Sequence, residues 1–221
     1  MAISVLITGT TGMVGKGVLL ECLKSDEVSS ITVINRSSLN MDHPKLKEII
    51  HQDFLDLTAV KKQFKNIDAC FFCLGVSSFR MDEDKYTKLT YDLTHHFASS
   101  FKEFNPEATF CYVSGTGTDS SEKGRIMWAR VKGRTENALL DMFKSAYMFR
   151  PGYIQPMDGI RSKTPLYDNL YKVFKPIYSV LKLFPGAATN TANTGKAMIR
   201  VAIDKPNQRI LENKAINTLS K

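Results

Sequence analysis

The stretch Val5-Leu6-Ile7-Thr8-Gly9-Thr10-Thr11-Gly12-Met13-Val14-Gly15-Lys16-Gly17 places glycines at regular spacing between an apolar run and a helix-forming segment. Gly9 permits a tight turn with positive φ, Gly12 lets a ligand approach the backbone, and Gly15 allows close packing of helix on strand. The N–H groups and dipole at the start of the helix attract phosphate charge. The pattern therefore predicts a strand–turn–helix unit that binds a phosphate-bearing ligand, and a purely structural glycine turn is the alternative.

Short apolar runs alternate with longer amphipathic stretches on both sides of this unit. Ala69–Leu74 is almost wholly apolar, which indicates a strand buried on both faces. Asp82–Phe104 repeats apolar residues at helical spacing and predicts one long helix. Further strands are expected at Ile3–Ile7, Ile31–Asn35, Lys47–His51, Thr109–Ser114 and Tyr147–Arg150, and further helices at Met13–Lys24, Thr58–Phe64 and Ile126–Phe143. Because strands joined by helical crossovers pair in parallel, the predicted class is α/β, a doubly wound, mostly parallel Rossmann sheet with helices on both faces.

The alternation of strands and helices changes after residue 152. We expect a single domain over residues 1–221, with a cofactor-binding core at 1–152 and a small C-terminal appendage at 153–221 that serves as a substrate or lid region. Thr164–Phe184 is amphipathic and carries several lysines, but Pro176 interrupts it. Packing as core or lid is the favoured interpretation of this segment, with self-association as a homodimer and contact with a membrane as alternatives. A helix at Thr194–Ala202 and a strand at Gln208–Leu211 complete the expected elements.

Composition excludes several classes of function. The net charge is +8, yet the lysines and arginines are dispersed, so we expect no nucleic-acid partner. Cys70 and Cys73 form a CxxC pair inside an apolar strand, without a second pair to complete a metal site, which predicts reduced thiols and no metal. The sequence shows neither a signal-peptide pattern nor an apolar run long enough to cross a membrane, so a cytoplasmic location is expected and membrane association is not.

The end of the second predicted strand bears on the identity of the ligand. In proteins that bind NAD, an acidic residue at this point accepts a hydrogen bond from the ribose 2′-OH. Here Asn35 takes that position, and Arg36 and Ser37 follow it. A guanidinium pairs with a 2′-phosphate, so the sequence predicts NADP(H) in preference to NAD(H). An arginine unrelated to any cofactor is the alternative.

The segment Thr8–Gly15 resembles the turn of extended and atypical short-chain dehydrogenase/reductases. Within that group, the chain most resembles the small TIP30-like, NmrA-like and NAD-dependent epimerase-like members. The similarity lies in its short length and in the sequence Val131-Lys132-Gly133 followed by Glu136. The resemblance implies that Ser114 and Thr116 orient a substrate carbonyl and that Lys132 holds the nicotinamide ribose. Together with the glycine turn, it implies cofactor contacts at Gly9, Thr11, Gly12, Met13, Val14, Gly15, Asn35, Arg36, Ser37, Asp53, Phe54, Leu74, Gly75, Lys132, Pro151 and Gly152.

The resemblance departs from the family pattern at the residue that relays a proton. The family carries Tyr-x-x-x-Lys on the helix after the fifth strand, whereas this sequence reads Trp128-Ala129-Arg130-Val131-Lys132. An indole N–H does not ionise near neutral pH. A different acid, with Tyr153 ahead of Tyr86 and Tyr91, is one alternative, and a shifted register that makes Trp128 a packing residue is another.

Two functions follow from these observations. The first is an NADP(H)-binding oxidoreductase or epimerase-like protein of the atypical short-chain type, acting on a small molecule that the sequence does not identify. The second is a non-catalytic protein that senses NADP(H) and regulates a partner, a hypothesis that rests on the tryptophan at position 128.

Overall fold

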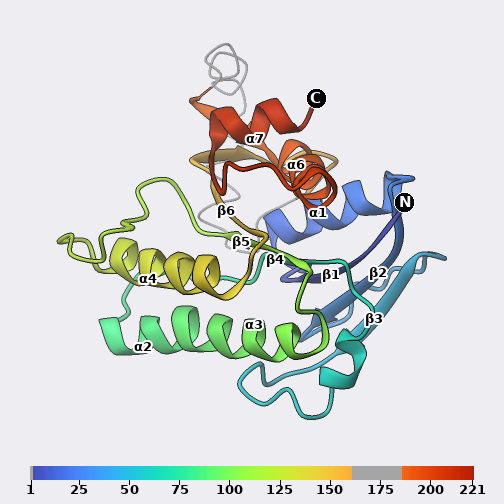
Figure 1. Ribbon diagram of the computed structural model, residues 1–221, viewed down its shortest axis with the longest axis horizontal. Helices are drawn as coiled ribbons and strands as arrows, with labels where there is room; N and C mark the ends of the chain where they lie inside the picture. The colour runs from blue at the N-terminus through green and yellow to red at the C-terminus, as the bar shows by residue number, and fades with distance from the viewer. Residues whose placement is uncertain (1, 161–185) are drawn as a thin grey trace.

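The computed structural model describes residues 2–160 and 186–221, and a parallel sheet lies at its centre (Figure 1). Within these residues the sheet has seven strands in the order β3-β2-β1-β4-β5-β6-β9, and each neighbouring pair is parallel. The strands are β1 (Ile3–Thr8), β2 (Val28–Asn35), β3 (Leu46–Ile50), β4 (Ala69–Phe72), β5 (Thr109–Val113), β6 (Ala146–Arg150) and β9 (Ile210–Glu212). The strand order reverses between β1 and β4, which is the point where open α/β sheets bind ligands. The predicted doubly wound fold is confirmed.

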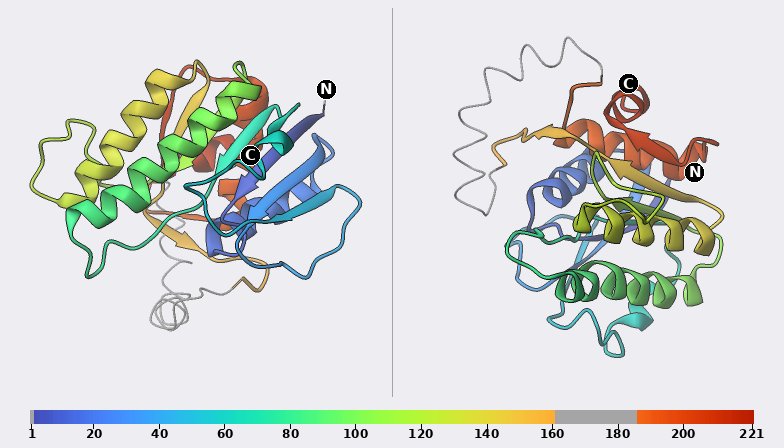
Figure 2. Two further views of the ribbon diagram at one scale, coloured as in Figure 1. Left: turned by 90° about the horizontal axis from the view of Figure 1, so that it is seen from below. Right: turned by 90° about the vertical axis from the view of Figure 1, so that its left-hand side faces the viewer.

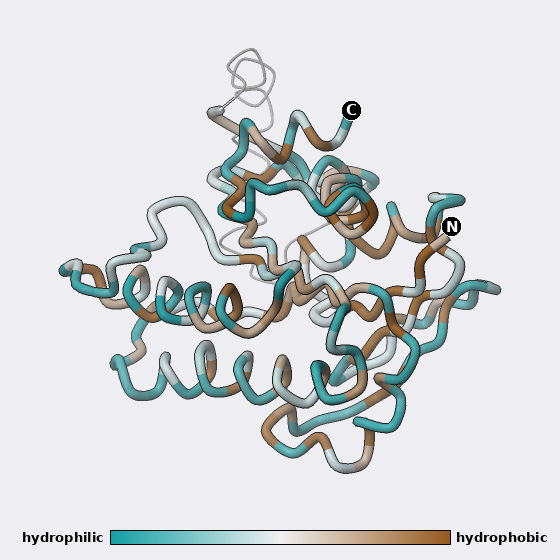
Figure 3. The backbone as a smooth tube through the Cα atoms, viewed as in Figure 1, coloured by the Kyte–Doolittle hydropathy of each residue, from teal (hydrophilic) through white to brown (hydrophobic). Residues whose placement is uncertain are grey.

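Helices cover both faces of the sheet (Figure 2). One face carries α1 (Met13–Lys24), α6 (Thr191–Asp204) and α7 (Asn213–Leu219), and the other carries η1 (Lys61–Phe64), α3 (Leu93–Phe104) and α4 (Met127–Met142). Each face has its own apolar core, because the sheet separates side chains that alternate along its strands. In Figure 3 hydrophobic residues recur on the helices between hydrophilic ones, as expected of helices with one buried side.

The four cysteines follow this division into two cores. Cys70 lies in the core under α3 and α4, whereas Cys73, three residues later, packs against the core under α1. All four thiols are free, and burial raises the pKa of Cys73 to about 12. The pair therefore sits on opposite sides of the sheet, as the strand interpretation predicts. Within the described ranges no group of three or more His, Cys, Asp or Glu side chains is arranged to hold a metal ion.

The long helix expected over Asp82–Phe104 is interrupted by one wider turn. Asp82 caps its start by accepting a hydrogen bond from the Lys85 N–H at 2.8 Å, and α2 (Glu83–Thr87) leads into a π-helical turn, η2 (Lys88–Asp92), before α3 begins. A π turn holds an additional residue, so the buried face is displaced around the axis. This displacement is a tertiary adjustment that the apolar periodicity does not reveal.

The C-terminal region contributes more to the main body than the expected appendage. Strand β9 pairs with β6 in the central sheet, and α6 and α7 cover one face of it. The expected helix at Thr194–Ala202 extends to the bounds of α6, while α7 has no counterpart among the predicted elements. Among the residues that the structure describes, only β7 (Tyr153–Gln155) and β8 (Ala188–Asn190) form a separate pair. The amphipathic segment Thr164–Phe184 lies outside the described residues.

Helices α1 and α6 approach each other through glycines. A Cβ on Gly17 would lie 2.4 Å from the Thr191 Cβ, and a Cβ on Gly195 would lie 2.9 Å from the Glu21 Cβ. Real Cβ atoms do not approach this closely, so the two helices require glycine at their crossing. No helix among the described residues is long and apolar enough to span a membrane.

Candidate functional site

The glycine turn joins β1 to α1 at the carboxyl edge of the sheet. Gly9 has φ of +70°, and a Cβ there would lie 2.6 Å from the carbonyl oxygen of Cys73. A Cβ on Gly15 would lie 2.3 Å from the Gly9 carbonyl oxygen. The Gly12 N–H closes the turn by donating to that same oxygen at 2.9 Å. The turn is thus compressed between the start of α1 and the chain that leaves β4, and two of its positions accept only glycine.

The start of α1 is open to an anionic ligand. Gly12 is the N-cap, it supplies no side-chain acceptor, and the first turn of the helix contains no acidic residue. The N–H groups of Met13 and Val14 therefore have neither an intrahelical partner nor a capping side chain. Thr11 is half-buried beside them. Helix α1 is 12 residues long, and Gly12 at its positive end has no Cβ that would keep a ligand from the backbone. The residues present therefore fit the pyrophosphate of a dinucleotide.

The residue at the end of β2 occupies a different environment from the one expected. Asn35 is only 3% exposed. Its Oδ1 accepts a hydrogen bond from Thr10 Oγ1 at 2.8 Å, and its Nδ2 donates to Glu48 Oε1 at 3.1 Å. The amide is thus engaged within the protein rather than directed at a ribose. Arg36 and Ser37, by contrast, are exposed.

The segments after β3 and β4 complete the expected adenine side. Asp53 is exposed, and its Oδ1 accepts a hydrogen bond from the Leu55 N–H at 2.9 Å. The Phe54 side chain belongs to the core, 4% exposed, so only its backbone is available to a ligand. Leu74 is half-buried against the same core, whereas Gly75 is exposed and no heavy atom lies within 4 Å of the position a Cβ would take. Gly75 therefore borders open space.

The two hydroxyls expected to orient a substrate point in different directions. Ser114 is 7% exposed, and its Oγ donates to the Glu136 carboxylate and lies 3.1 Å from the Phe149 carbonyl oxygen. Its hydroxyl is therefore held inside the protein, which differs from the role the resemblance implies. Thr116 is exposed, and its Oγ1 lies 3.1 Å from the Arg150 carbonyl oxygen and 3.3 Å from Glu212 Oε2. Of the two, Thr116 is the hydroxyl that a substrate can reach.

Trp128 and Lys132 lie one turn apart on α4, beside the loop that follows β5. The Lys132 ammonium donates to the Ser114 carbonyl oxygen, and burial lowers the pKa of this lysine to about 8, with the Glu136 carboxylate acting in the opposite direction. The Trp128 ring lies 3.5 Å from the position of a Cβ on Gly117. Both side chains therefore contact the 114–117 loop.

The three tyrosines considered as substitute acids have different surroundings. Tyr86 is 1% exposed, and burial raises its pKa. The Tyr91 ring lies 4.1 Å from the guanidinium carbon of Arg134. Tyr153 is half-buried directly after Gly152, and its hydroxyl donates to Gln155 Oε1 at 2.8 Å. Tyr153 is thus the one of the three that lies next to the predicted nicotinamide end.

Hydrogen bonds and an ion pair tie the end of β6 to its neighbours, and two of the residues involved, Arg150 and Asn213, are not among the predicted site residues. Glu136 is fully buried and accepts from Arg150 Nε at 3.1 Å, and a second guanidinium nitrogen completes the ion pair. Asn213, at the start of α7, accepts a hydrogen bond from the Gly152 N–H at 3.1 Å, and Pro151 is buried with its carbonyl oxygen 3.0 Å from the Thr116 N–H. The sequence alone does not reveal the roles of Arg150 and Asn213, because their partners lie 14 and 61 residues away in the chain.

The parallel sheet and the glycine turn at its carboxyl edge define the class of the protein as a Rossmann fold. The family model described as the NAD dependent epimerase/dehydratase family matches residues 5–130, and the chain belongs to this family. The predicted relationship to short-chain dehydrogenase/reductases of the epimerase-like kind is confirmed.

Comparison with individual proteins agrees with this assignment. The chain is 24% identical over 205 residues to the protein called FMP52, mitochondrial, of Debaryomyces hansenii, covering 90% of this chain and 86% of that protein. It is 27% identical over 154 residues to HTATIP2 of Rattus norvegicus, covering 68% and 62%. Among solved structures, Gre2 of Candida albicans in complex with NADPH has a TM-score of 0.69 at 18% identity, covering 95% of this chain and 78% of that one. WbmF of Bordetella bronchiseptica in complex with NAD⁺ has a TM-score of 0.65 at 16% identity, covering 98% and 76%. These two structures support the fold.

Proposed function

We propose that this chain binds NADP(H) at the glycine turn and acts as an oxidoreductase or epimerase-like protein of the atypical short-chain type on a small carbonyl or hydroxyl compound. The observation that carries the proposal is the uncapped start of α1, together with the hydrogen bond that joins Thr10 of the glycine turn to Asn35, the residue before the exposed Arg36. A bound nicotinamide would supply the hydride chemistry. In this proposal, backbone N–H groups and glycines bind the pyrophosphate. The side chain of Arg36 distinguishes a 2′-phosphate from a 2′-OH.

The residues at the nicotinamide end of the site would orient the substrate and hold the ribose. Thr116 presents the accessible hydroxyl that would orient a substrate oxygen, next to the carboxylate of Glu212. Lys132 would hold the nicotinamide ribose, and its lowered pKa allows the ammonium to give up a proton near neutral pH. The indole of Trp128 stands where the family carries its proton donor, so a proton for the substrate comes from another group.

Titration of the intrinsic fluorescence tests cofactor binding. Trp128 is the only tryptophan, so its emission reports on a single position that contacts the 114–117 loop. We expect quenching by NADPH at micromolar concentration and quenching by NADH only at concentrations about tenfold higher or more, with calorimetry as the independent measurement. Equal affinities would remove the role of Arg36 and keep the fold assignment. The absence of binding in both measurements would overturn the proposal.

A second function, a sensor of NADP(H) without turnover, is favoured by one observation. The residue one turn before Lys132 is Trp128, whose ring packs on Gly117 rather than offering a hydroxyl. The variant Trp128→Tyr distinguishes the two functions. A gain of NADPH-dependent carbonyl reduction from an inactive parent would support the sensor, whereas activity already present in the parent and unchanged in the variant would assign proton transfer to another residue, with Tyr153 tested next.

We propose a small-molecule substrate and no nucleic-acid partner, on the ground that the 30 lysines and arginines are dispersed. We also propose a cytoplasmic location and a homodimer. Light scattering of the purified chain and fluorescence microscopy of a tagged chain test them.

A further inference from the structure

The carboxylate of Glu48 lies under the turn that follows β2. Glu48 is half-buried on β3, and its Oε1 accepts hydrogen bonds from Asn35 Nδ2 at 3.1 Å and from the Leu39 N–H at 3.0 Å. Its Oε2 accepts from Ser38 Oγ at 2.8 Å. One side chain from β3 therefore fixes the last residue of β2 and the third and fourth residues after it.

The same contacts remove other groups of the turn from the cofactor. Asn35 accepts from Thr10 and donates to Glu48, so both ends of its amide are used. The Ser38 hydroxyl is used by Glu48 as well. An acidic residue selects NAD by accepting a hydrogen bond from the ribose 2′-OH, whereas the Glu48 carboxylate is directed at Asn35, Ser38 and Leu39. The acidic residue next to the end of β2 is thus Glu48, and its carboxylate is directed at the turn after β2.

Arg36 is the charged group that this arrangement leaves facing solvent. It is exposed, and the structure records no ion pair for it among the residues described. Its backbone is held on the other side, where Gln52 Nε2 donates to its carbonyl oxygen at 2.5 Å. The turn is linked to the phosphate-binding loop through Thr10, which donates to Asn35. The backbone that carries the guanidinium is therefore fixed relative to the glycine turn.

We propose that Glu48 is a positioning residue that sets the preference for NADP(H), because it holds the 36–39 turn in the shape that presents Arg36 to the adenosine 2′-phosphate. The inference rests on the proposed function, since it requires NADP(H) at the glycine turn. Preorganisation of a cationic side chain strengthens its pairing with phosphate, because less conformational freedom is lost on binding. Glu48 acts through the position of Arg36 and does not touch the phosphate itself.

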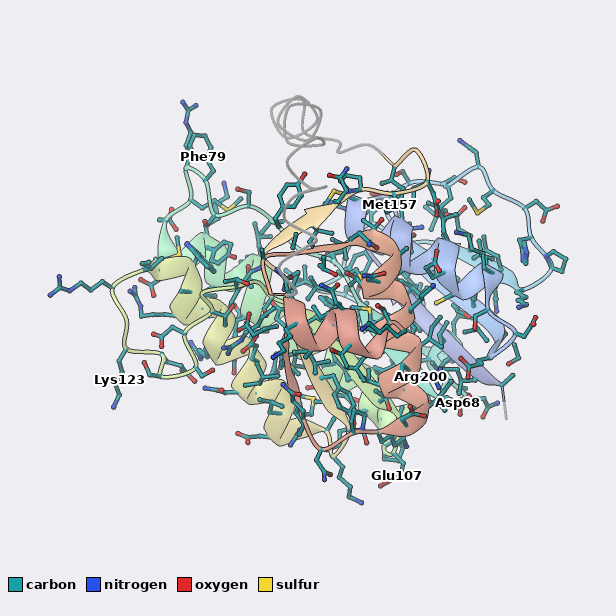
Figure 4. All side chains as sticks on the ribbon, turned by 90° about the horizontal axis from the view of Figure 1, so that it is seen from above. Asp68, Phe79, Glu107, Lys123, Met157 and Arg200 are labelled. Atoms are coloured by element: carbon teal, nitrogen blue, oxygen red, sulfur yellow. The ribbon has the colours of Figure 1, made fainter. Side chains whose placement is uncertain are left out.

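The experiment measures dissociation constants for NADPH and NADH with the full chain, by the emission of Trp128 and by calorimetry. The variants are Glu48→Ala, Glu48→Gln, Arg36→Ala and the double variant of Arg36→Ala with Glu48→Ala. The control is Glu107→Ala, which removes an exposed carboxylate at the edge of the molecule, where it pairs with Lys144 at 3.1 Å (Figure 4). Circular dichroism checks that each variant is folded before titration.

We expect Glu48→Ala to weaken NADPH binding about tenfold and NADH binding less than about twofold, which brings the ratio of the two constants close to one. The double variant should bind no more weakly than Arg36→Ala alone, because the two residues act as a unit. Glu48→Gln keeps one acceptor oxygen and should retain an intermediate ratio, which also serves if Glu48→Ala does not fold. Glu107→Ala should match the parent chain.

Other results would overturn the inference in identifiable ways. An unchanged ratio in Glu48→Ala, or equal weakening of both dinucleotides, would assign Glu48 a structural role only. Tighter NADPH binding by Glu48→Gln would mean that the charge of Glu48 opposes the 2′-phosphate. A parent chain that binds both dinucleotides equally has no preference to set, which refutes the inference and leaves dinucleotide binding intact. A parent chain that binds neither refutes the proposed function as well.

Discussion

Lys132 is a cation held against the protein interior, and its ionisation links the candidate site to stability. Burial lowers its pKa from 10.5 in the unfolded chain to about 8 in the folded chain. Between these two values the unfolded state binds the proton and the folded state does not, so the free energy of unfolding rises with pH in this window. Below pH 8 both states carry the charge, and the folded state bears the full desolvation penalty.

The comparison of the parent chain with Lys132→Met measures this linkage. We expect the free energy of unfolding of the parent to rise relative to the variant by about 2–3 kcal/mol between pH 8 and pH 10.5, since one pKa unit corresponds to about 1.4 kcal/mol. Denaturant titrations at several pH values give the two curves. The control is Lys144→Met, which removes an ammonium on a side chain that is 81% exposed and should shift no curve with pH. Parallel curves for Lys132→Met would contradict the lowered pKa.

Helices α1 and α6 pack closely because each has a glycine at their crossing. Gly17 meets Thr191, and Gly195 meets Glu21, so the backbones lie closer than two ordinary helices allow. This close crossing holds α6 against α1, and the first turn of α1 forms the candidate phosphate-binding surface. The position of the candidate site therefore depends on the packing of a helix that comes near the end of the chain.

The variant Gly17→Ala tests the crossing. Its new Cβ would lie 2.4 Å from the Thr191 Cβ, which forces the helices apart. We expect a loss of about 1–3 kcal/mol in the free energy of unfolding, even though alanine favours helices, because overpacking in a buried contact exceeds that gain. Urea denaturation measures it. The neighbouring exposed position gives the control, Lys16→Ala, which should change stability by less than about 0.5 kcal/mol. Stabilisation by Gly17→Ala would show that the helices can separate freely.

At the scale of the whole molecule, the two ends of the chain share one core. Met198 of α6, Leu211 of β9 and Ile216 of α7 are fully buried in the cluster that also contains Val5 and Val18. Strand β9 supplies the neighbour of β6 in the sheet. The residues after 152 therefore contribute to the core on the α1 face of the sheet, and we expect residues 1–152 to depend on them for folding.

A chain that ends at Gly152 tests this conclusion. We expect it to lose cooperative unfolding and to expose apolar surface, because one face of the sheet and the edge of β6 would be uncovered. Chemical denaturation followed by circular dichroism, together with binding of an apolar dye, measures both effects. A chain that lacks only the exposed Lys221 is the control and should behave like the parent. A cooperative transition in the 1–152 chain would show that it folds alone.

Local patterns in the sequence determined the class of fold and the phosphate-binding turn. The apolar strand Ala69–Phe72 and the helix Met13–Lys24 lie where their periodicity predicts, because side-chain direction repeats within a few residues in each kind of element. The glycine turn is equally clear from the sequence, since Gly9 has a positive φ and Cβ atoms on Gly12 and Gly15 would crowd the Gly9 carbonyl oxygen a few residues away. These features need no knowledge of distant parts of the chain.

Tertiary structure alone decided what the polar side chains of the site do. The position of Asn35 in the sequence predicts a contact with the ribose, but its amide donates a hydrogen bond to the carboxylate of Glu48, 13 residues away. Ser114 was given a catalytic role, but Glu136, 22 residues away, takes its hydroxyl inside, while Thr116 meets a glutamate 96 residues away. The cause is the parallel topology, which brings the carboxyl ends of β2, β3, β5, β6 and β9 to one edge of the sheet. A hydrogen bond depends on those positions in space, and no spacing along the chain encodes them.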